Sequence, residues 1–183
     1  MKFGTMVIDP PWPISMAGQI KGRQNRPRSL PYQSMSIAEI KSMRIPDLLE
    51  VGSHVYLWCT NKTLRDAYDV LDAWGLRFHQ VLVLTKPSGI APALGYIFGT
   101  EFCLLAFNGR PRKPFLKIGT LNHFSRPSVR GQHSSKPDYF YNMVTQMSPG
   151  PYADVFSRKK RDGWNIWGNE VESDFKILYR LDG

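Results

Sequence analysis

Cysteine is scarce in this 183-residue sequence, and long apolar runs are absent from it. Cys59 and Cys103 both lie in apolar, strand-like stretches, so we expect buried free thiols in a reducing compartment. No apolar run approaches the roughly 20 residues that a membrane-spanning helix needs. Asp9 comes too early for the apolar region of a signal peptide. These absences predict a cytoplasmic protein with no membrane partner.

Two kinds of ligand site also lack their usual sequence signals. The four histidines show no metal-ligand spacing, so we expect no metal site. There is no G-x-G-x-x-G loop, which argues against an ordinary dinucleotide enzyme. With 42% hydrophobic and 21% charged residues the composition is that of a globular protein. The length suits one domain over residues 1–183.

Acidic residues are missing from two long segments, although basic residues are frequent there. The net charge is +9, and no Asp or Glu occurs between Asp9 and Glu39 or between Glu101 and Asp138. Unmixed positive charge suits a polyanion, although a merely basic surface is the alternative. A further basic run covers residues 158–161. The residues expected to contact a nucleic-acid backbone are Lys21, Arg23, Arg26, Arg28, Arg110, Arg112, Lys113, Lys117, Arg126 and Arg130.

Strand-like and helix-like stretches alternate, which predicts an α/β domain with a mostly parallel sheet. We expect strands at residues 4–8, 54–60, 78–86, 101–107 and 152–157, and an edge strand or hairpin partner at 175–181. We expect helices at 36–49, 63–74 and 136–147, the first opened by a capping box of Ser36 and Glu39. Residues 13–31 and 108–135 read as irregular and basic. Because ligands bind beyond the carboxyl ends of strands in such sheets, we expect both segments near Asp9.

The stretch "VIDPPWPI", residues 7–14, ends the first strand in a stiff, polar turn. Asp9 and the Pro10 carbonyl are acceptors that could hold an exocyclic amine. Trp12 offers a face on which a base could stack. The alternative is a structural turn with a core tryptophan.

The motif "DPPW" within this stretch is the first of four motifs that follow one another along the chain. "DPPW" is followed by "LPYQSMS" and then by "HSSKPDYFY" and "DVFSRKKRDGWNIWGNE". In this order the motifs resemble the MT-A70 family of adenine methyltransferases, which includes bacterial and phage enzymes. The resemblance implies a Rossmann-like fold that uses S-adenosylmethionine (SAM). It also implies a mostly parallel sheet, helices on both faces and a permuted motif order.

The resemblance also implies roles for individual residues. Asp9, Pro10, Pro11 and Trp12 match the catalytic tetrapeptide. Tyr32 matches a tyrosine that closes over the substrate, and Glu101 an acid that contacts the base; packing and surface roles are the alternatives. Asp154 stands where the family more commonly has Glu. The implied cofactor-binding residues are Asp9, Lys136, Asp154, Phe156, Arg158, Asn169 and Glu170.

These patterns predict a SAM-dependent methyltransferase that acts on the exocyclic amine of adenine in DNA. The same chemistry on RNA is the first alternative. A catalytically inactive nucleic-acid-binding subunit is the second, although that class typically loses the residues retained here. Family members often pair through loops between the central strands, so a homodimer is one expected assembly.

Overall fold

The computed structural model describes residues 1–13, 34–93, 96–112, 123–125 and 136–180. In this part of the chain seven strands form one sheet in the order β5-β3-β4-β2-β1-β6-β7. Four of the pairings are parallel, and β4 runs antiparallel to both of its neighbours. The strands are β1 (Phe3–Ile8), β2 (Leu49–Thr60), β3 (Arg77–Ala93), β4 (Tyr96–Phe107), β5 (His123–Ser125), β6 (Tyr152–Val155) and β7 (Trp164–Trp167).

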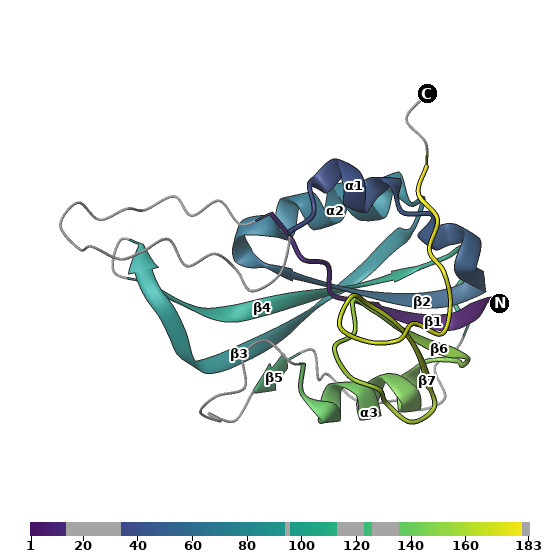
Figure 1. Cartoon of the computed structure of the whole chain (residues 1–183). Helices are drawn as coiled ribbons and strands as arrows, with labels where there is room; N and C mark the ends of the chain where they lie inside the picture. The colour runs from purple at the N-terminus through teal and green to yellow at the C-terminus, as the bar shows by residue number, and fades with distance from the viewer. Residues whose placement is uncertain (14–33, 94–95, 113–122, 126–135, 181–183) are drawn as a thin grey trace.

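Helices cover both faces of the sheet, as the sequence predicts (Figure 1). α1 (Ile37–Ser42) and α2 (Leu64–Ala73) lie on one face, and α3 (Asp138–Met147) lies on the other. Two short 3-10 helices, η1 (Ile45–Leu48) and η2 (Asn61–Thr63), flank β2. This arrangement confirms the Rossmann-like α/β fold.

The central strand β1 is buried along its whole length and divides the core into two layers. Met6 and Ile8 pack in the layer beneath α1 and α2, whereas Val7 packs in the layer beneath α3. This alternation follows from the two-residue period of a strand covered on both faces. Cys59 and Cys103 are buried free thiols, as expected.

α1 begins as predicted but ends early. The Ser36 hydroxyl accepts from the Glu39 amide, and the Glu39 carboxylate accepts from the Ser36 amide, which completes the capping box. The helix ends at Ser42, not at residue 49. Pro46 explains this, because its ring would clash with the Ser42 carbonyl in a continuous helix. That carbonyl instead accepts from the Arg180 amide at 2.7 Å.

The prediction of an edge strand at residues 175–181 is wrong, and β7 forms that edge instead. Asp174 occupies the free side of β7: its carboxylate accepts from the Ile166 amide at 2.8 Å, and its own amide donates to the Ile166 carbonyl at 2.8 Å. The following segment makes only a single bridge, between Tyr179 and Met43. Asp174 therefore occupies the Ile166 groups with which another strand would have to pair.

The expected third and fourth strands both extend into the segment between them. β3 continues to Ala93 and β4 begins at Tyr96, so residues 87–93 and 96–100 belong to an antiparallel arm that extends from the body of the molecule (Figure 1). β5 lies within the stretch read as irregular and pairs with β3. Among the described residues, no helix is both long and apolar enough to cross a bilayer.

Candidate active site

The carboxyl ends of the parallel strands β1, β2 and β6 lie around Asp9, and Glu101 of β4 lies at the same end of the sheet. Asp9 follows β1 directly, and its amide donates to the Val155 carbonyl at the end of the parallel strand β6. β2 ends at Thr60 on the other side of β1. Because β4 is antiparallel to β2, its Glu101 pairs with Thr60 and lies at the same edge. The fold therefore brings Asp9 and Glu101 together from distant parts of the chain.

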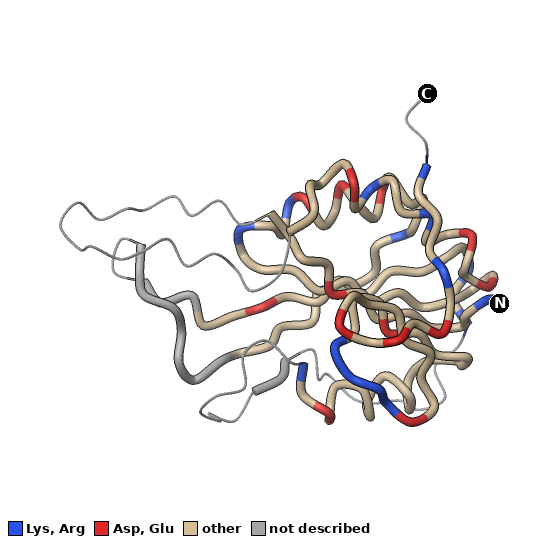
Figure 2. The backbone as a smooth tube through the Cα atoms, viewed as in Figure 1, with Lys and Arg blue, Asp and Glu red and all other residues tan. Residues whose placement is uncertain are grey.

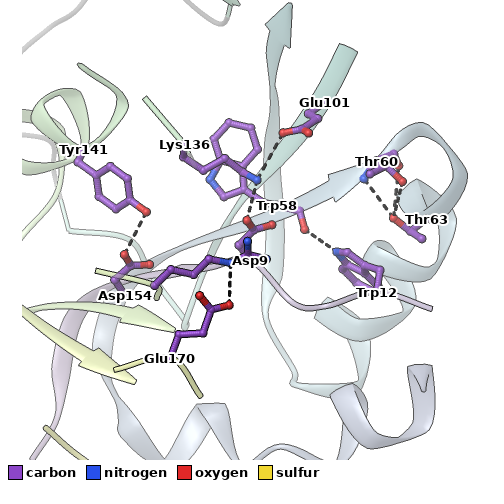
Figure 3. Close-up of polar contacts among 11 residues, drawn as sticks. Asp9, Trp12, Trp58, Thr60, Thr63, Glu101, Lys136, Tyr141, Asp154 and Glu170 are labelled. Carbon is purple, nitrogen blue, oxygen red and sulfur yellow. Dashed lines mark hydrogen bonds and ion pairs between the residues drawn. The ribbon is translucent and has the colours of Figure 1, made fainter. Parts of the chain in front are cut away.

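Lys136 joins these two acids (Figure 3). Its ammonium Nζ lies 2.6 Å from Asp9 Oδ2 and 3.4 Å from Glu101 Oε2, and 4.9 Å from the ring centre of Trp58. The Lys136 side chain is only 6% exposed, while that of Asp9 is 33% exposed. Burial alone would lower the pKa of Lys136, but the Asp9 and Glu101 carboxylates outweigh it and raise that pKa above its usual value. Lys136 is therefore a fixed positive charge.

Main-chain and indole hydrogen bonds fix the Asp-Pro-Pro-Trp turn. The Trp12 amide donates to the Pro10 carbonyl at 2.8 Å, and the Met35 amide donates to the Pro11 carbonyl at the same distance. The Trp12 indole N–H donates to the Trp58 carbonyl at 2.8 Å (Figure 3). Trp12 is 5% exposed and belongs to the core, so its ring offers no open face for stacking. In this structure its contacts are those of a residue that anchors the turn.

A second tight turn follows β6, next to Asp9. Phe156 has a φ of +66°, which is rare for a bulky residue. The preceding Asp154 points into the protein, where its carboxylate accepts from the Tyr141 hydroxyl at 3.1 Å and the Ser157 hydroxyl at 3.0 Å. Burial raises the pKa of Asp154 to about 6, against the lowering effect of those two hydrogen bonds. The structure thus places Asp154 beneath the turn and not on its outer surface.

The outer residues of this region are held by ion pairs. Arg158 Nε lies 3.6 Å from Glu170 Oε1, and both side chains are exposed. Arg161 donates to Asp138 at 2.8 Å, and its guanidinium carbon lies 3.6 Å from the centre of the Tyr141 ring. Figure 2 shows this basic run, residues 158–161, as a continuous blue stretch beside α3. Asn169, also exposed, directly precedes Glu170.

Two of the basic residues expected near Asp9, Arg110 and Arg112, do not lie there, which corrects the expectation from sequence for these two. Arg110 and Arg112 follow the end of β4, at the edge of the sheet opposite to Glu101 and Asp9. Arg112 pairs there with Glu50 at 2.8 Å. The remaining residues expected to bind substrate or backbone lie outside the described residues: Lys21, Arg23, Arg26, Arg28, Tyr32, Lys113, Lys117, Arg126 and Arg130.

Sequence reasoning missed three residues of this site. Trp58 supplies the ring beside Lys136 and the carbonyl that anchors Trp12. Tyr141 and Ser157 supply the hydrogen bonds to Asp154. Tyr141 was expected only as part of the helix at 136–147, and Ser157 only as the end of a strand. Ser157 stands three residues after Asp154, a spacing at which a hydroxyl readily reaches an Asp side chain, and this was the one available signal.

Comparison with known proteins identifies the family of the chain. The family model described as MT-A70 matches residues 3–170. The chain is 28% identical over 181 residues to the N(6)-adenosine-methyltransferase MT-A70-like protein of Drosophila melanogaster, a match that covers 93% of this chain and 27% of that protein. It is 26% identical to the N6-methyladenosine RNA methyltransferase MTA1 of Pyricularia oryzae, covering 92% of this chain and 47% of that one.

A third relative is closer in length. The chain is 24% identical to the type II methyltransferase M.MunI of Mycoplasma sp, over all of this chain and 83% of that enzyme. By contrast, the chain spans about a quarter of the length of the first curated relatives that it matches. With a family match over nearly its whole length, the chain belongs to the MT-A70 family.

Proposed function

We propose that this protein is a SAM-dependent methyltransferase that acts on the exocyclic amine of adenine in DNA. The observation that carries the proposal is the buried Lys136 held between Asp9 and Glu101, at the sheet edge where this fold class binds ligands. Family membership supports the reaction type, since several relatives bear adenine or adenosine N6-methyltransferase names.

The residues at this edge fit the chemical groups of SAM. The methionine end of SAM carries an ammonium and a carboxylate. Asp9 and Lys136 present the two complementary charges side by side, and Asp9 is accessible to solvent. Glu170 is an exposed carboxylate of the kind that hydrogen-bonds a ribose diol. We therefore assign Asp9 and Lys136 to the methionine end, and Glu170 and Asn169 to the ribose.

The chemistry demands positioning more than acid–base strength. When bound, SAM supplies an electrophilic methyl group on a sulfonium. The adenine amine is a weak nucleophile, because its lone pair is delocalised into the ring. The Asp9 carboxylate would accept a hydrogen bond from that amine, which localises the lone pair and orients the nitrogen. After the carbon–nitrogen bond forms, Asp9 is also placed to receive the proton that the nitrogen releases.

Lys136 fixes the position of the Asp9 carboxylate for this role. Its ammonium Nζ lies 2.6 Å from Asp9 Oδ2. The turn hydrogen bonds of Trp12 and Met35 hold the backbone on either side of Pro11, so the carboxylate starts from a fixed frame. The role of Trp12 in this mechanism is therefore to position Asp9.

The proposal also includes a choice between DNA and RNA as the substrate. We favour DNA because M.MunI, a relative that matches this chain over most of both lengths, is a type II methyltransferase. RNA is the second candidate, because MTA1, an RNA methyltransferase by name, matches 92% of the chain. Phosphate contacts dominate the affinity of both classes of complex, so charge alone does not separate them.

A methyl-transfer assay tests the proposal. Purified protein is incubated with methyl-labelled SAM and with DNA and RNA of the same sequence in competition. The nucleosides are then separated, and label is expected in N6-methyldeoxyadenosine. Asp9→Asn should lower the rate at least a hundredfold, whereas Asp47→Asn, a surface acid paired with Arg44, should leave it unchanged. Label in RNA alone would move the proposal to the second candidate.

The inactive-subunit alternative has its own readout. Calorimetry with SAM is expected to show binding to the wild-type protein and loss of binding in Lys136→Met. If the wild-type protein binds DNA tightly but shows neither SAM binding nor methyl transfer, the catalytic proposal fails. A nucleic-acid-binding subunit then becomes the better description.

A further inference from the structure

The Phe156 turn stores backbone strain at the border of the candidate active site. The left-handed region is unfavourable for a bulky residue, so this conformation persists only where its surroundings hold it. The turn is directly coupled to Asp9, because the Val155 carbonyl accepts from the Asp9 amide. What holds Phe156 in place therefore also bears on the geometry around Asp9.

Ser157 is the residue that closes this turn. Its amide donates to the Trp167 carbonyl at 3.0 Å, which ties the turn to the end of β7. Its hydroxyl lies 3.0 Å from Asp154 Oδ2 and 2.9 Å from the Lys159 carbonyl, two acceptors that compete for one proton. A charged carboxylate is the stronger acceptor of the two. Protonation of Asp154 would release the hydroxyl to Lys159.

Tyr141 connects the same carboxylate to α3. Its hydroxyl donates to Asp154 Oδ2 at 3.1 Å, and its ring carries the Arg161 guanidinium on one face. Arg161 in turn donates to Asp138, the first residue of α3, two positions after Lys136. Contacts therefore run without a gap from the helix that follows Lys136 to the turn that follows β6.

We propose that Asp154 is a positioning residue that, with Tyr141 and Ser157, holds the Phe156 turn in the shape that the cofactor site requires. This differs from the direct cofactor contact that the family resemblance implies, because the Asp154 side chain is buried and both of its hydrogen bonds are internal. The cofactor half of the inference rests on the proposed function. The structural half does not.

The network predicts a pH dependence in a useful range. Burial places the pKa of Asp154 at about 6. The other charged groups that act on it are Arg161, which lowers this pKa, and Asp9 on the neighbouring strand, which raises it. As pH falls through about 6, Asp154 becomes neutral and its hold on Ser157 weakens. SAM affinity should therefore fall over the same interval.

Two variants and one matched control test the inference. Tyr141→Phe and Ser157→Ala each remove one hydroxyl from Asp154. Tyr152→Phe is the control: it removes a hydroxyl from the other end of β6, where that group donates to the Thr145 and Ser148 carbonyls. Amide hydrogen exchange in the free protein is followed at residue 157, whose N–H bonds Trp167, with Leu57 in β2 as the reference for global opening.

The second measurement is the affinity for SAM between pH 5 and 8. We expect Tyr141→Phe to speed exchange at residue 157 at least tenfold relative to Leu57. We also expect it to shift the fall in SAM affinity to higher pH, because the lost hydrogen bond lowers the pKa of Asp154 in the wild type. Ser157→Ala should act in the same direction on both readouts. Tyr152→Phe should change neither readout.

The outcomes separate the inference from the proposed function. Unchanged relative exchange at residue 157 in both variants overturns the structural half, whatever the protein binds. Faster exchange with an unshifted SAM profile overturns the cofactor half while the methyltransferase proposal stands. A wild-type protein that does not bind SAM overturns the proposed function and the cofactor half together, and the exchange result still decides the structural half.

Discussion

The indole N–H of Trp12 donates a hydrogen bond to the main-chain carbonyl of Trp58. Pairing between β1 and β2 ends at Ile8 and Leu57, so this bond continues the ladder one residue further with a side chain in place of a strand. The bond holds the Asp-Pro-Pro-Trp turn against β2, at the residue Trp58 whose ring lies beside Lys136. The tryptophan of this motif therefore acts through its N–H as well as through its apolar area.

Trp12→Phe should be more damaging than loss of ring size explains. The variant leaves the buried Trp58 carbonyl without its indole donor, a cost of about 1–2 kcal/mol beyond lost packing. Trp74→Phe is the matched control, because the buried Trp74 indole N–H has no acceptor among the described residues. Urea unfolding of both variants gives the comparison, and methyl transfer should fall only in the first. Equal destabilisation of the two variants would contradict an anchoring role for the bond.

Removal of the Lys136 charge should affect both stability and cofactor binding. Lys136→Met leaves the carboxylates of Asp9 and Glu101 close together without their cation. We expect a loss of about 2 kcal/mol, less than for a fully buried pair because Asp9 is partly exposed. SAM affinity should fall at least tenfold.

The double variant Lys136→Met with Glu101→Gln separates these two effects. Neutralising Glu101 removes much of the repulsion, so unfolding stability should recover in part. SAM binding should not recover, because the cation expected to meet the SAM carboxylate is still missing. Recovery of both properties would show that Lys136 serves only the protein's internal charge balance.

Much of the site's membership could be predicted from sequence, but its orientations could not. Asp9, Glu101 and Lys136 follow from motifs that match a family, and the structure brings all three into contact. The direction of the Asp154 carboxylate depends on Tyr141, on another element, and on how deeply β6 is buried. No local sequence pattern predicts whether the Asp154 carboxylate points into the protein or out to solvent.

The fold shows the same division between local and distant causes. The capping box of α1 is a four-residue signal, and it was correct. The apolar alternation at residues 175–181 read equally well as a strand, but an edge strand needs a neighbour with free hydrogen-bonding groups. In β7, Asp174 already binds the amide and carbonyl of Ile166. Whether this strand-like sequence forms a strand thus depends on another residue, Asp174, that binds backbone groups of the neighbouring strand.

Gly168 permits the close approach on which the Phe156 turn depends. A Cβ at Gly168 would collide with the Ser157 carbonyl oxygen, a backbone atom that cannot move without disturbing the turn. Gly168→Ala should therefore cost about 2 kcal/mol and weaken SAM binding. Gly163→Ala is the control: it has open space but a φ of +75°, so strain alone should cost about 1 kcal/mol and SAM affinity should hold. Unchanged SAM binding in Gly168→Ala would disconnect this contact from the cofactor site.

Asp154 should also leave a signature in the pH dependence of unfolding. Its pKa is raised from an ordinary 3.8 to about 6, so between these values the folded state binds more protons than the unfolded state. Stability contributed at this position is therefore highest at low pH and declines as pH rises through about 6. His54 works in the opposite direction, because burial lowers its pKa and protonation at low pH opposes folding. The measured dependence of unfolding free energy on pH contains both contributions. The contribution of Asp154 is isolated by comparing the wild-type protein with a variant that lacks this carboxylate.

The comparison with Asp154→Asn supplies that difference, since the amide is nearly isosteric and does not titrate. Relative to the variant, the wild-type protein should lose about 2 kcal/mol of unfolding free energy between pH 4.5 and 7.5. Urea titrations of the two proteins at both pH values measure this loss. The contribution of His54 cancels in the comparison, because both proteins contain that residue. A constant difference across this range would mean that Asp154 keeps an ordinary pKa when folded. Its buried hydrogen bonds to Tyr141 and Ser157 could not then be the source of a pH-dependent hold on the Phe156 turn.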